Sequence, residues 1–460
     1  MKIIIRDEIL KSDHVAIADD LGRKVTYREL AESAEVLSGT FQKRGLIFFL
    51  CDHHMESFEV IYKILYLNLV PLLLAEDINR ELLDNLISIY QPQYIYCKKT
   101  YGIDGCRVDG TSLKEHKLLC LNKKNHNIHP DVAVLLSTSG TTGSPKLVKI
   151  SYYGLYNSAK QVCLRMNIQS GQKGLSPLSM SYVYGLTFCI WHWHCGATLL
   201  VTEHSVLSRE FSKFFIAEKA NHFAGTPYIY QMLQKIHFWD HEKLECLHWA
   251  MSAGMQMTER DQIEMVSLMK DKFWIMYGQT ECTNFISATN FDKNNIRLNT
   301  VGKLLEGSEA VIDQDTRELT IKSKNVSMGY ATNIAQLAEG DINQGIVNTG
   351  DAAYMDDDGY IYLQGRLSRY VKILGKRVSL DDVEKYLAEK ISDAEFACIG
   401  TDGNISVFYT KENGDVDKEI QSILDRNMKI PKKFVSCSYL EKIPRNGPGK
   451  VAYARLRELA

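Results

Sequence analysis

Short apolar runs alternate with stretches of helical periodicity along the first three hundred residues. The runs lie at 46–51, 132–136 and 197–201, and helical spacing of apolar residues occurs beside each of them. Uninterrupted apolar runs of this length are typical of strands that are buried on both faces of a parallel sheet. Strands of this kind linked by helices predict an α/β fold.

Two helices are predicted close to the start of the chain. Residues 25–43 and 55–68 both carry apolar side chains at helical spacing. Thr26 is followed three residues later by Glu29, a spacing that fits a capping box at the first helical turn.

The pattern changes after residue 300, where strand-like segments become short and closely spaced. Residues 352–355 and 360–363 flank the sequence Asp-Asp-Asp-Gly, which favours a hairpin. The elements predicted beyond residue 370 are helices at 380–391, begun by a capping box of Ser379 and Asp382, and at 416–428, and strands at 395–399, 405–410 and near 434–438. This part of the chain therefore has an α+β pattern.

The two patterns predict two domains. We expect a large N-terminal domain of layered α/β subdomains over residues 1–367 and a small α+β domain over residues 368–460. The length of 460 residues agrees with two or three domains.

Composition and charge exclude several classes of protein. Apolar residues make up 45% of the chain and charged residues 24%, as in ordinary globular proteins. The 54 basic and 56 acidic residues give a net charge of −2, so no overall basic field exists to bind nucleic acid. The apolar stretch among the first residues is too short for a secretory signal, and no apolar stretch is long enough for a membrane span. The 11 scattered cysteines include no Cys-x-x-Cys pair, and we expect reduced thiols in a cytoplasmic protein.

A glycine-rich loop is the first candidate for chemistry. The apolar run that ends at Ser137 leads into small hydroxyl residues and glycines, and then into Pro145 and Lys146. Glycines let backbone N–H groups turn toward an anion, and a lysine adds a charge suited to phosphate. Proline before the lysine rules out a Walker A loop, although an ordinary flexible turn stays open. The candidate phosphate-binding residues are Thr138, Ser139, Gly140, Thr141, Thr142, Gly143 and Lys146.

This loop resembles the signature of the adenylate-forming superfamily, which includes acyl-CoA synthetases, peptide-synthetase adenylation domains and firefly luciferase. Further motifs of that family follow in its order. They are Tyr277-Gly278-Gln279-Thr280-Glu281, Thr349-Gly350-Asp351, Gly365-Arg366 and Pro444-Arg445-Asn446-Gly447-Pro448-Gly449-Lys450. The resemblance extends from about residue 15 to the end of the chain.

The resemblance implies a role in ATP binding for many of these residues. Thr280 and Glu281 would lie near the phosphates, with Glu281 as a ligand of Mg²⁺, a cation that prefers oxygen ligands. Asp351 and Arg366 would bind the ribose hydroxyls, and Lys450 would be the catalytic lysine. The remaining nucleotide-binding residues implied are Ala253, Gly254 and Met255 against adenine, with Tyr277 and Gln279 beside them.

The family reaction has two halves. A carboxylate attacks the α-phosphorus of ATP to give an acyl-adenylate and pyrophosphate, and a thiol then attacks the acyl carbon and releases AMP. The resemblance implies either coenzyme A or the phosphopantetheine of a carrier protein as the thiol, with Lys372 and Gly375 near its arm. Lys450 lies in the small domain, so domain closure would assemble the site. At the usual Asp or Lys pivot of the hinge this chain has Ser368.

The segment around Tyr182 resembles the part of acyl-CoA synthetases that lines the acid pocket. Tyr182, Tyr184 and Gly278 are the candidate pocket residues, although the tyrosines could equally be core. Amino-acid-activating relatives usually carry an Asp where this chain has Val183, and a buried ammonium without a carboxylate is costly. This disfavours an α-amino acid unless an acid such as Glu306 serves instead. We expect a small carboxylic acid.

Two other hypotheses about function stay open. The chain could be a stand-alone amino-acid adenylation enzyme that loads a carrier protein, or a nucleotide-binding protein without catalysis. Zinc at His192, His194 and Cys195 is disfavoured, because no second pair of ligands occurs at suitable spacing. His53 and His54 are expected to be loop residues.

Overall fold

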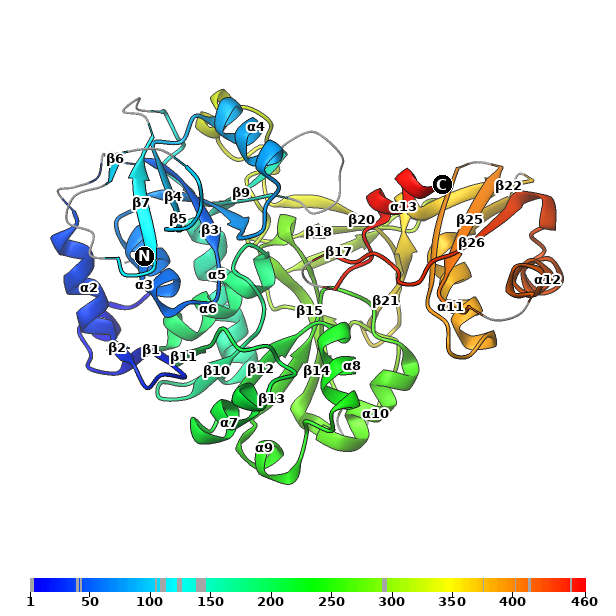
Figure 1. Ribbon diagram of the computed structural model, residues 1–460, viewed down its shortest axis with the longest axis horizontal. Helices are drawn as coiled ribbons and strands as arrows, with labels where there is room; N and C mark the ends of the chain where they lie inside the picture. The colour runs from blue at the N-terminus through cyan, green and yellow to red at the C-terminus, as the bar shows by residue number, and fades with distance from the viewer. Residues whose placement is uncertain are drawn as a thin grey trace. The chain divides into compact units, whose positions relative to one another are not determined.

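The structure is a computed structural model, and its described residues form two compact units (Figure 1). The described residues are 4–38, 41, 44–103, 106–107, 113–121, 126–137, 146–291, 296–374, 376–401, 403–412, 415–446 and 449–460. The second unit contains 311–320 and the chain from 348 onward, and the first unit contains the rest of the described chain. That residues 368–460 move as a separate domain stays a prediction.

A nine-stranded sheet forms one layer of the first unit. Its strands in spatial order are β16 (Lys303–Leu304), β15 (Asn284–Asn290), β14 (Phe273–Gln279), β13 (Trp249–Ser252), β12 (His222–Gly225), β10 (Lys173–Leu175), β11 (Thr198–Val201), β1 (Val15–Asp19) and β2 (Lys24–Thr26). The strands from β14 to β1 are parallel, and antiparallel strands flank them.

An eight-stranded sheet forms a second layer of the same unit. Its strands in spatial order are β19 (Tyr330–Ala331), β9 (Leu147–Ser151), β8 (Val132–Ser137), β4 (Val70–Ala75), β3 (Leu46–Cys51), β5 (Tyr94–Lys98), β7 (His116–Cys120) and β6 (Cys106–Arg107). The strands β8, β4, β3 and β5 are parallel. The predicted α/β fold with parallel strands is confirmed.

Helices cover both faces of the two sheets. The helices of the first unit are α1 (Asp7–Leu10), α2 (Tyr27–Val36), α3 (Met55–Tyr66), α4 (Arg80–Tyr90), α5 (Tyr152–Met166), α6 (Val183–Cys195), α7 (Arg209–Ala217), α8 (Pro227–Lys235), α9 (His241–Cys246) and α10 (Glu259–Met269), with 3-10 turns η1 (Lys270–Lys272), η2 (Thr280–Cys282) and η3 (Ala335–Ala338). The helices α3, α5 and α6 lie between the sheets (Figure 1), where one continuous apolar core joins them.

The strand β3 shows how the sequence specifies these layers. Its alternate side chains enter different cores: Ile47 and Phe49 face the core between the sheets, whereas Phe48 and Leu50 face the core under α4. All six residues are buried, which explains why the strand is an unbroken apolar run rather than an alternating one.

The helix predicted over 25–43 is shorter than its periodicity suggested. It begins as expected with a complete capping box between Thr26 and Glu29, but α2 ends at Val36. Gly39 follows in the sequence, and glycine has a lower helix propensity than any residue of α2.

We predict that Thr26→Ala lowers the free energy of unfolding by about 1 kcal/mol, because the N–H of Glu29 loses its side-chain acceptor. Thr26→Ser keeps an acceptor oxygen and should lose much less. Chemical denaturation of the three proteins checks this. Equal stability of the alanine variant and the parent would show that water replaces the cap at no cost.

The second unit has the α+β pattern expected beyond residue 370. Its elements are a sheet of β17 (Glu309–Ile312), β18 (Glu318–Lys322), β20 (Ile346–Met355) and β21 (Ile361–Arg366), η4 (Leu367–Arg369), a hairpin of β22 (Tyr370–Ile373) and β23 (Lys376–Ser379), a sheet of β24 (Phe396–Thr401), β25 (Asn404–Tyr409) and β26 (Val435–Tyr439), the helices α11 (Leu380–Lys390), α12 (Val416–Met428) and α13 (Tyr453–Leu459), and η5 (Lys432–Phe434). Of these strands, β17, β18 and β20 each have residues at one end that belong to the first unit. The predicted hairpin is confirmed as β20 and β21. Ser379 caps α11 as expected, by accepting a hydrogen bond from the N–H of Asp382.

Membrane spans and disulfides were both expected to be missing. In the described part of the chain, no helix is long and apolar enough to cross a membrane. The cysteines whose surroundings the structure describes are free thiols, most of them buried.

Candidate active site

Two of the predicted nucleotide-binding segments meet at one edge of the nine-stranded sheet. The strands β13 and β14 are parallel neighbours, so they run toward the same edge of the sheet, with Ser252 opposite Ile275 in the register. β13 ends at Ser252, directly before Ala253 and Gly254, and β14 ends at Gln279, directly before Thr280. Open α/β sheets bind ligands at this edge. Gly254 adopts φ +88°, a backbone conformation that favours glycine, and Met255 follows it.

The predicted magnesium ligand is connected to the lysine that ends the glycine-rich loop. Glu281 lies in η2, and its Oε1 accepts a hydrogen bond from the Tyr330 hydroxyl at 2.7 Å. The Nζ of Lys146 lies 3.4 Å from the centroid of the Tyr330 ring, a cation–π contact. Glu281 and Lys146 thus share Tyr330 as a common neighbour. Thr138 to Gly143, the other predicted phosphate-binding residues, lie outside the described residues.

Gly278 is required by the backbone around it. The pairing of β14 with β15 shifts register between Tyr277 and Gly278, which brings the carbonyl of Asn284 against the glycine. A Cβ atom at Gly278 would lie only 1.4 Å from that carbonyl oxygen. The position therefore excludes every side chain, and Tyr277 beside it is buried.

The predicted acid-pocket segment begins α6. Tyr182 is the N-cap residue and is half-buried, and burial together with the nearby Asp77 carboxylate raises its pKa to about 12. Tyr184 is buried, and its hydroxyl donates to the carbonyl of Met251 at 3.0 Å, near the end of β13. Burial raises the pKa of Tyr184 well above its usual value. Both hydroxyls are therefore protonated near neutral pH, and the start of α6 is fixed to the edge where β13 ends.

In the second unit the structure brings together the two predicted ribose ligands. Asp351 and Arg366 are directly paired across β20 and β21, and the Arg366 Nε lies 2.8 Å from Asp351 Oδ1. Arg366 Nη1 also donates to the carbonyl of Thr349 at 3.3 Å. Asp351 is buried while Arg366 is half-exposed, so the pair presents a carboxylate that is held from one side by a guanidinium.

Lys450 is held through its backbone by Asn446 in the same unit. Its N–H donates to Oδ1 of Asn446 at 3.0 Å, and its carbonyl accepts from the N–H of Asn446 at 2.8 Å. Arg445 Nη1 donates to the carbonyl of Gly449 at 2.8 Å. Lys372, predicted near the thiol arm, is exposed on β22, and Gly375 lies outside the described residues.

Comparison with known proteins decides the family. The family model described as "AMP-binding enzyme" matches residues 10–331, which is more than half of the chain. The chain belongs to the AMP-binding enzyme family.

Curated relatives of this AMP-binding enzyme match over nearly its whole length. A 2-succinylbenzoate–CoA ligase of Listeria monocytogenes is 23% identical over 95% of this chain and 95% of its own. A protein of the same name from Bacillus cereus is 25% identical over 99% of this chain and 98% of its own.

Solved structures of low identity share the fold of the AMP-binding enzyme. ATP-bound MatB from Rhodopseudomonas palustris has a TM-score of 0.81 at 19% identity and covers 100% of this chain and 98% of its own. The o-succinylbenzoate CoA synthetase of Bacillus subtilis, in complex with its acyl-adenylate intermediate, has a TM-score of 0.78 at 18% identity and covers 97% and 95%. The expected large N-terminal and small C-terminal domains agree with these neighbours.

These findings establish the class of reaction. The AMP-binding enzyme is an AMP-forming acid–thiol ligase: it joins a carboxylic acid to ATP as an acyl-adenylate, releases pyrophosphate and passes the acyl group to a thiol. The motif order had predicted this reaction, whereas no local signal distinguished Tyr330 from the other tyrosines, since its partner Glu281 lies 49 residues away.

Proposed function

We propose that this enzyme is a carboxylic acid–CoA ligase whose acid lacks an ammonium group, with 2-succinylbenzoate as the first acid to test. The observation that supports it is the match to CoA ligases of that name over 95% or more of both chains. A carrier protein is the weaker acceptor hypothesis, because the curated relatives reported above are named for coenzyme A.

The start of α6 supports an acid without an ammonium group. Val183, the first residue of the helix, is buried, and its side chain offers no charge. An ammonium buried here would lose its hydration without gaining a carboxylate partner, which costs several kcal/mol in apolar surroundings. Glu306, the other acid considered for this role, has an exposed side chain.

We assign nucleotide binding to both units. In the second unit, Asp351 would accept hydrogen bonds from the two ribose hydroxyls, and Arg366 would hold that carboxylate in place. In the first unit, the edge formed by β13 and β14 would contact adenine through Ala253, Gly254 and Met255. Thr280 and Lys146 would hold phosphate oxygens.

Glu281 fits a magnesium ion by the chemistry of its donors. Mg²⁺ prefers carboxylate and phosphate oxygens, and Glu281 is a half-exposed carboxylate with one oxygen bonded to Tyr330. When bound with ATP, Mg²⁺ would neutralise part of the triphosphate charge. The Tyr330 hydroxyl would hold the Glu281 carboxylate in a fixed orientation toward that ion.

Lys450 would act between two anions, the carboxylate of the acid and the α-phosphate of ATP. A carboxylate oxygen of the acid attacks the α-phosphorus, a new O–P bond forms, and the bond to the bridging oxygen of pyrophosphate breaks. Negative charge rises on the α-phosphate oxygens during this step, and an ammonium placed between them and the carboxylate stabilises that charge. In the second step the thiolate attacks the acyl carbon, and AMP leaves with the electrons of the broken O–C bond.

The test is acid-dependent pyrophosphate release from MgATP over a panel that contains 2-succinylbenzoate, aryl, fatty, hydroxy and amino acids. Each acid that responds is then offered coenzyme A or a holo carrier protein, and the release of AMP is measured. We expect the strongest response from an aryl or dicarboxylic acid and AMP release with coenzyme A.

Each of the other outcomes would support a different function for this protein. A response confined to amino acids with transfer to the carrier would overturn the proposal in favour of a stand-alone adenylation enzyme. ATP binding without pyrophosphate release from any acid would favour a nucleotide-binding protein without catalysis.

A further inference from the structure

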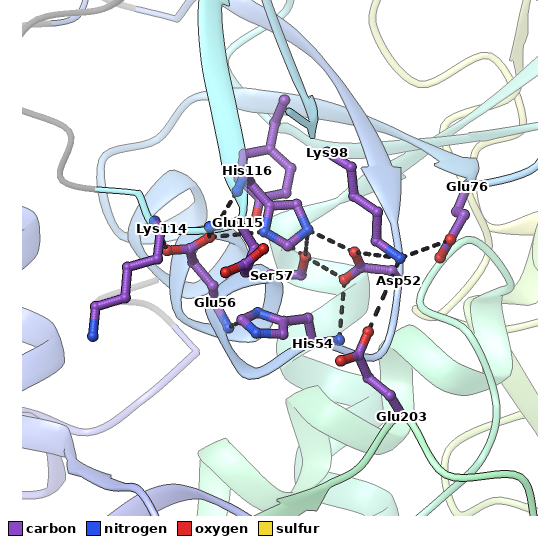
Figure 2. A network of polar contacts seen from close by, with 11 residues as sticks. Asp52, His54, Glu56, Ser57, Glu76, Lys98, Lys114, Glu115, His116 and Glu203 are labelled. Atoms are coloured by element: carbon purple, nitrogen blue, oxygen red, sulfur yellow. Dashed lines mark hydrogen bonds and ion pairs between the residues drawn. The ribbon is translucent and has the colours of Figure 1, made fainter. Parts of the chain in front are cut away.

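A network of buried charged groups lies where β3 ends and α3 begins, and the catalytic motifs do not use it. Asp52 and His116 are almost completely buried, and the His116 Nε2 lies 2.6 Å from Asp52 Oδ2 (Figure 2). The other ring nitrogen, Nδ1, lies 2.8 Å from Oε2 of Glu56. One imidazole therefore bridges two carboxylates from a single short segment of chain.

The contact between His116 and Asp52 has the form found behind metal-binding histidines. A histidine that binds a metal through one nitrogen commonly donates its other N–H to a carboxylate, which fixes the ring and its tautomer. Asp52 is itself held by the hydroxyl of Ser57 at 2.6 Å and by the N–H of His54 at 3.1 Å. With Nε2–H donated to Asp52, the lone pair of Nδ1 faces the oxygen of Glu56. Nδ1 of His116 and the Glu56 oxygen are then both acceptors and repel each other. A cation, either a proton or a metal ion, must therefore lie between them.

A third ligand adjoins that position. One ring nitrogen of His54, one carboxylate oxygen of Glu56 and one ring nitrogen of His116 lie within 4.8 Å of one another. His54 is half-buried, and its Nδ1 carries a lone pair rather than a proton, because it accepts a long hydrogen bond of 3.2 Å from the N–H of Glu56. His54 lies in the loop between β3 and α3, as the sequence suggested, and it is also the N-cap residue of α3.

The charge around the three ligands favours a cation. Besides Asp52 and Glu56, the carboxylates of Glu76 and Glu203 lie nearby, at 2.8 Å and 4.0 Å from the ammonium of Lys98 (Figure 2). Lys98 also lies 3.7 Å from Asp52. Asp52, Glu76 and Glu203 lie around Lys98, and Asp52 and Glu56 contact His116. A divalent ion would balance charge that the lysine and the histidine leave over.

We propose that His54, Glu56 and His116 bind one Zn²⁺ ion, with Asp52 as the carboxylate that orients His116. Two imidazoles and a carboxylate form a donor set that suits zinc, whereas Mg²⁺ and Ca²⁺ prefer oxygen ligands alone. Water would complete the tetrahedron on the half-exposed side of His54. Bonds of about 2.0 Å to zinc require roughly 3.3 Å between the nitrogen and the oxygen, so His116 and Glu56 would move apart by about 0.5 Å.

The site would join two segments far apart in the chain. The carboxylate of Glu56 also accepts the N–H groups of Lys114 and His116, at 2.6 and 3.1 Å, and so holds the start of β7 against the start of α3. Zinc would strengthen the same connection, and binding would stabilise the folded protein by an amount that rises with the logarithm of the zinc concentration relative to Kd. The role proposed is therefore structural.

The test uses the full-length protein after chelator treatment, without ATP or Mg²⁺, and ZnCl₂ as the probe. Competition with a chromogenic chelator measures stoichiometry and affinity, and thermal unfolding measures the accompanying stabilisation. We expect one Zn²⁺ per chain. His54→Asn keeps an acceptor at the N-cap but removes the imidazole, and it should weaken binding by roughly a hundredfold or more, since changes in the outer shell alone cost 10- to 100-fold.

The matched control is His53→Asn, which removes the neighbouring imidazole and should bind zinc like the parent. Glu56→Gln is a second ligand variant that preserves side-chain size, and its folding is checked by circular dichroism. The proposal is overturned if the parent binds less than one zinc per chain at micromolar concentrations. It is equally overturned if His54→Asn and Glu56→Gln, both folded, bind as tightly as the parent, in which case a proton alone bridges His116 and Glu56.

Discussion

Replacing Lys450 with alanine should reduce acid-dependent pyrophosphate release by roughly 10²- to 10³-fold, equivalent to about 3–4 kcal/mol of transition-state stabilisation. The ammonium is assigned to the charge that develops on the α-phosphate, so its loss raises the barrier to chemistry more than it weakens the ground state. ATP binding, measured by calorimetry, should change by less than tenfold. Single-turnover pyrophosphate release with a saturating acid gives the rate directly.

The matched control is Lys442→Ala in the same unit. Lys442 is exposed, and it precedes Lys450 in the same part of the chain. Its removal deletes the same charge from the same part of the chain and should leave the rate within about twofold, since isolated exposed charges contribute little. Equal rates for Lys450→Ala and the parent would remove Lys450 from the reaction.

Gly278→Ala should lower the free energy of unfolding much more than the same methyl group added at an open position. The added Cβ would lie 1.4 Å from the carbonyl oxygen of Asn284, and that neighbour is backbone, which cannot rotate away as a side chain can. Overpacking commonly costs 1–3 kcal/mol, and a clash with backbone should reach roughly 3 kcal/mol or more. Thermal unfolding and the yield of soluble protein measure this loss.

Gly102→Ala provides the comparison. A Cβ atom at Gly102 meets nothing within 4 Å, so the same chemical change should alter stability by less than about 0.5 kcal/mol. If Gly278→Ala were as stable as Gly102→Ala, the register shift between β14 and β15 would have to relax at little cost.

Local features of the fold could be predicted because they depend on neighbouring residues. The strand β3 coincides with the apolar run at 46–51, since burial on both faces leaves no polar position inside it. The Thr26 and Glu29 capping box required only two residues at fixed spacing. The end of α2 was placed too far along the chain, because periodicity continues past the residue where tertiary contacts stop supporting the helix.

The contacts of the candidate sites depend on residues that are distant in sequence. His116 pairs with Asp52 across 64 positions, and Tyr330 reaches Glu281 across 49. No spacing rule connects such residues, since sheet topology decides which strand ends become neighbours. The family resemblance supplied the residues that relatives share, and it could supply neither Tyr330 as a support for Glu281 nor the bridge between two carboxylates at His116.

The backbone contacts of Lys450 bear on what would have to be ordered before the proposed reaction. Residue 446 binds the backbone of Lys450 through both its side chain and its N–H, and Arg445 secures Gly449 beside it. An unsupported backbone would lose about 1–2 kcal/mol of conformational entropy for each residue fixed on the way to the transition state. For the role proposed for Lys450, the unit would supply this local ordering of the backbone when it folds, so that less of it would have to be restricted during each turnover.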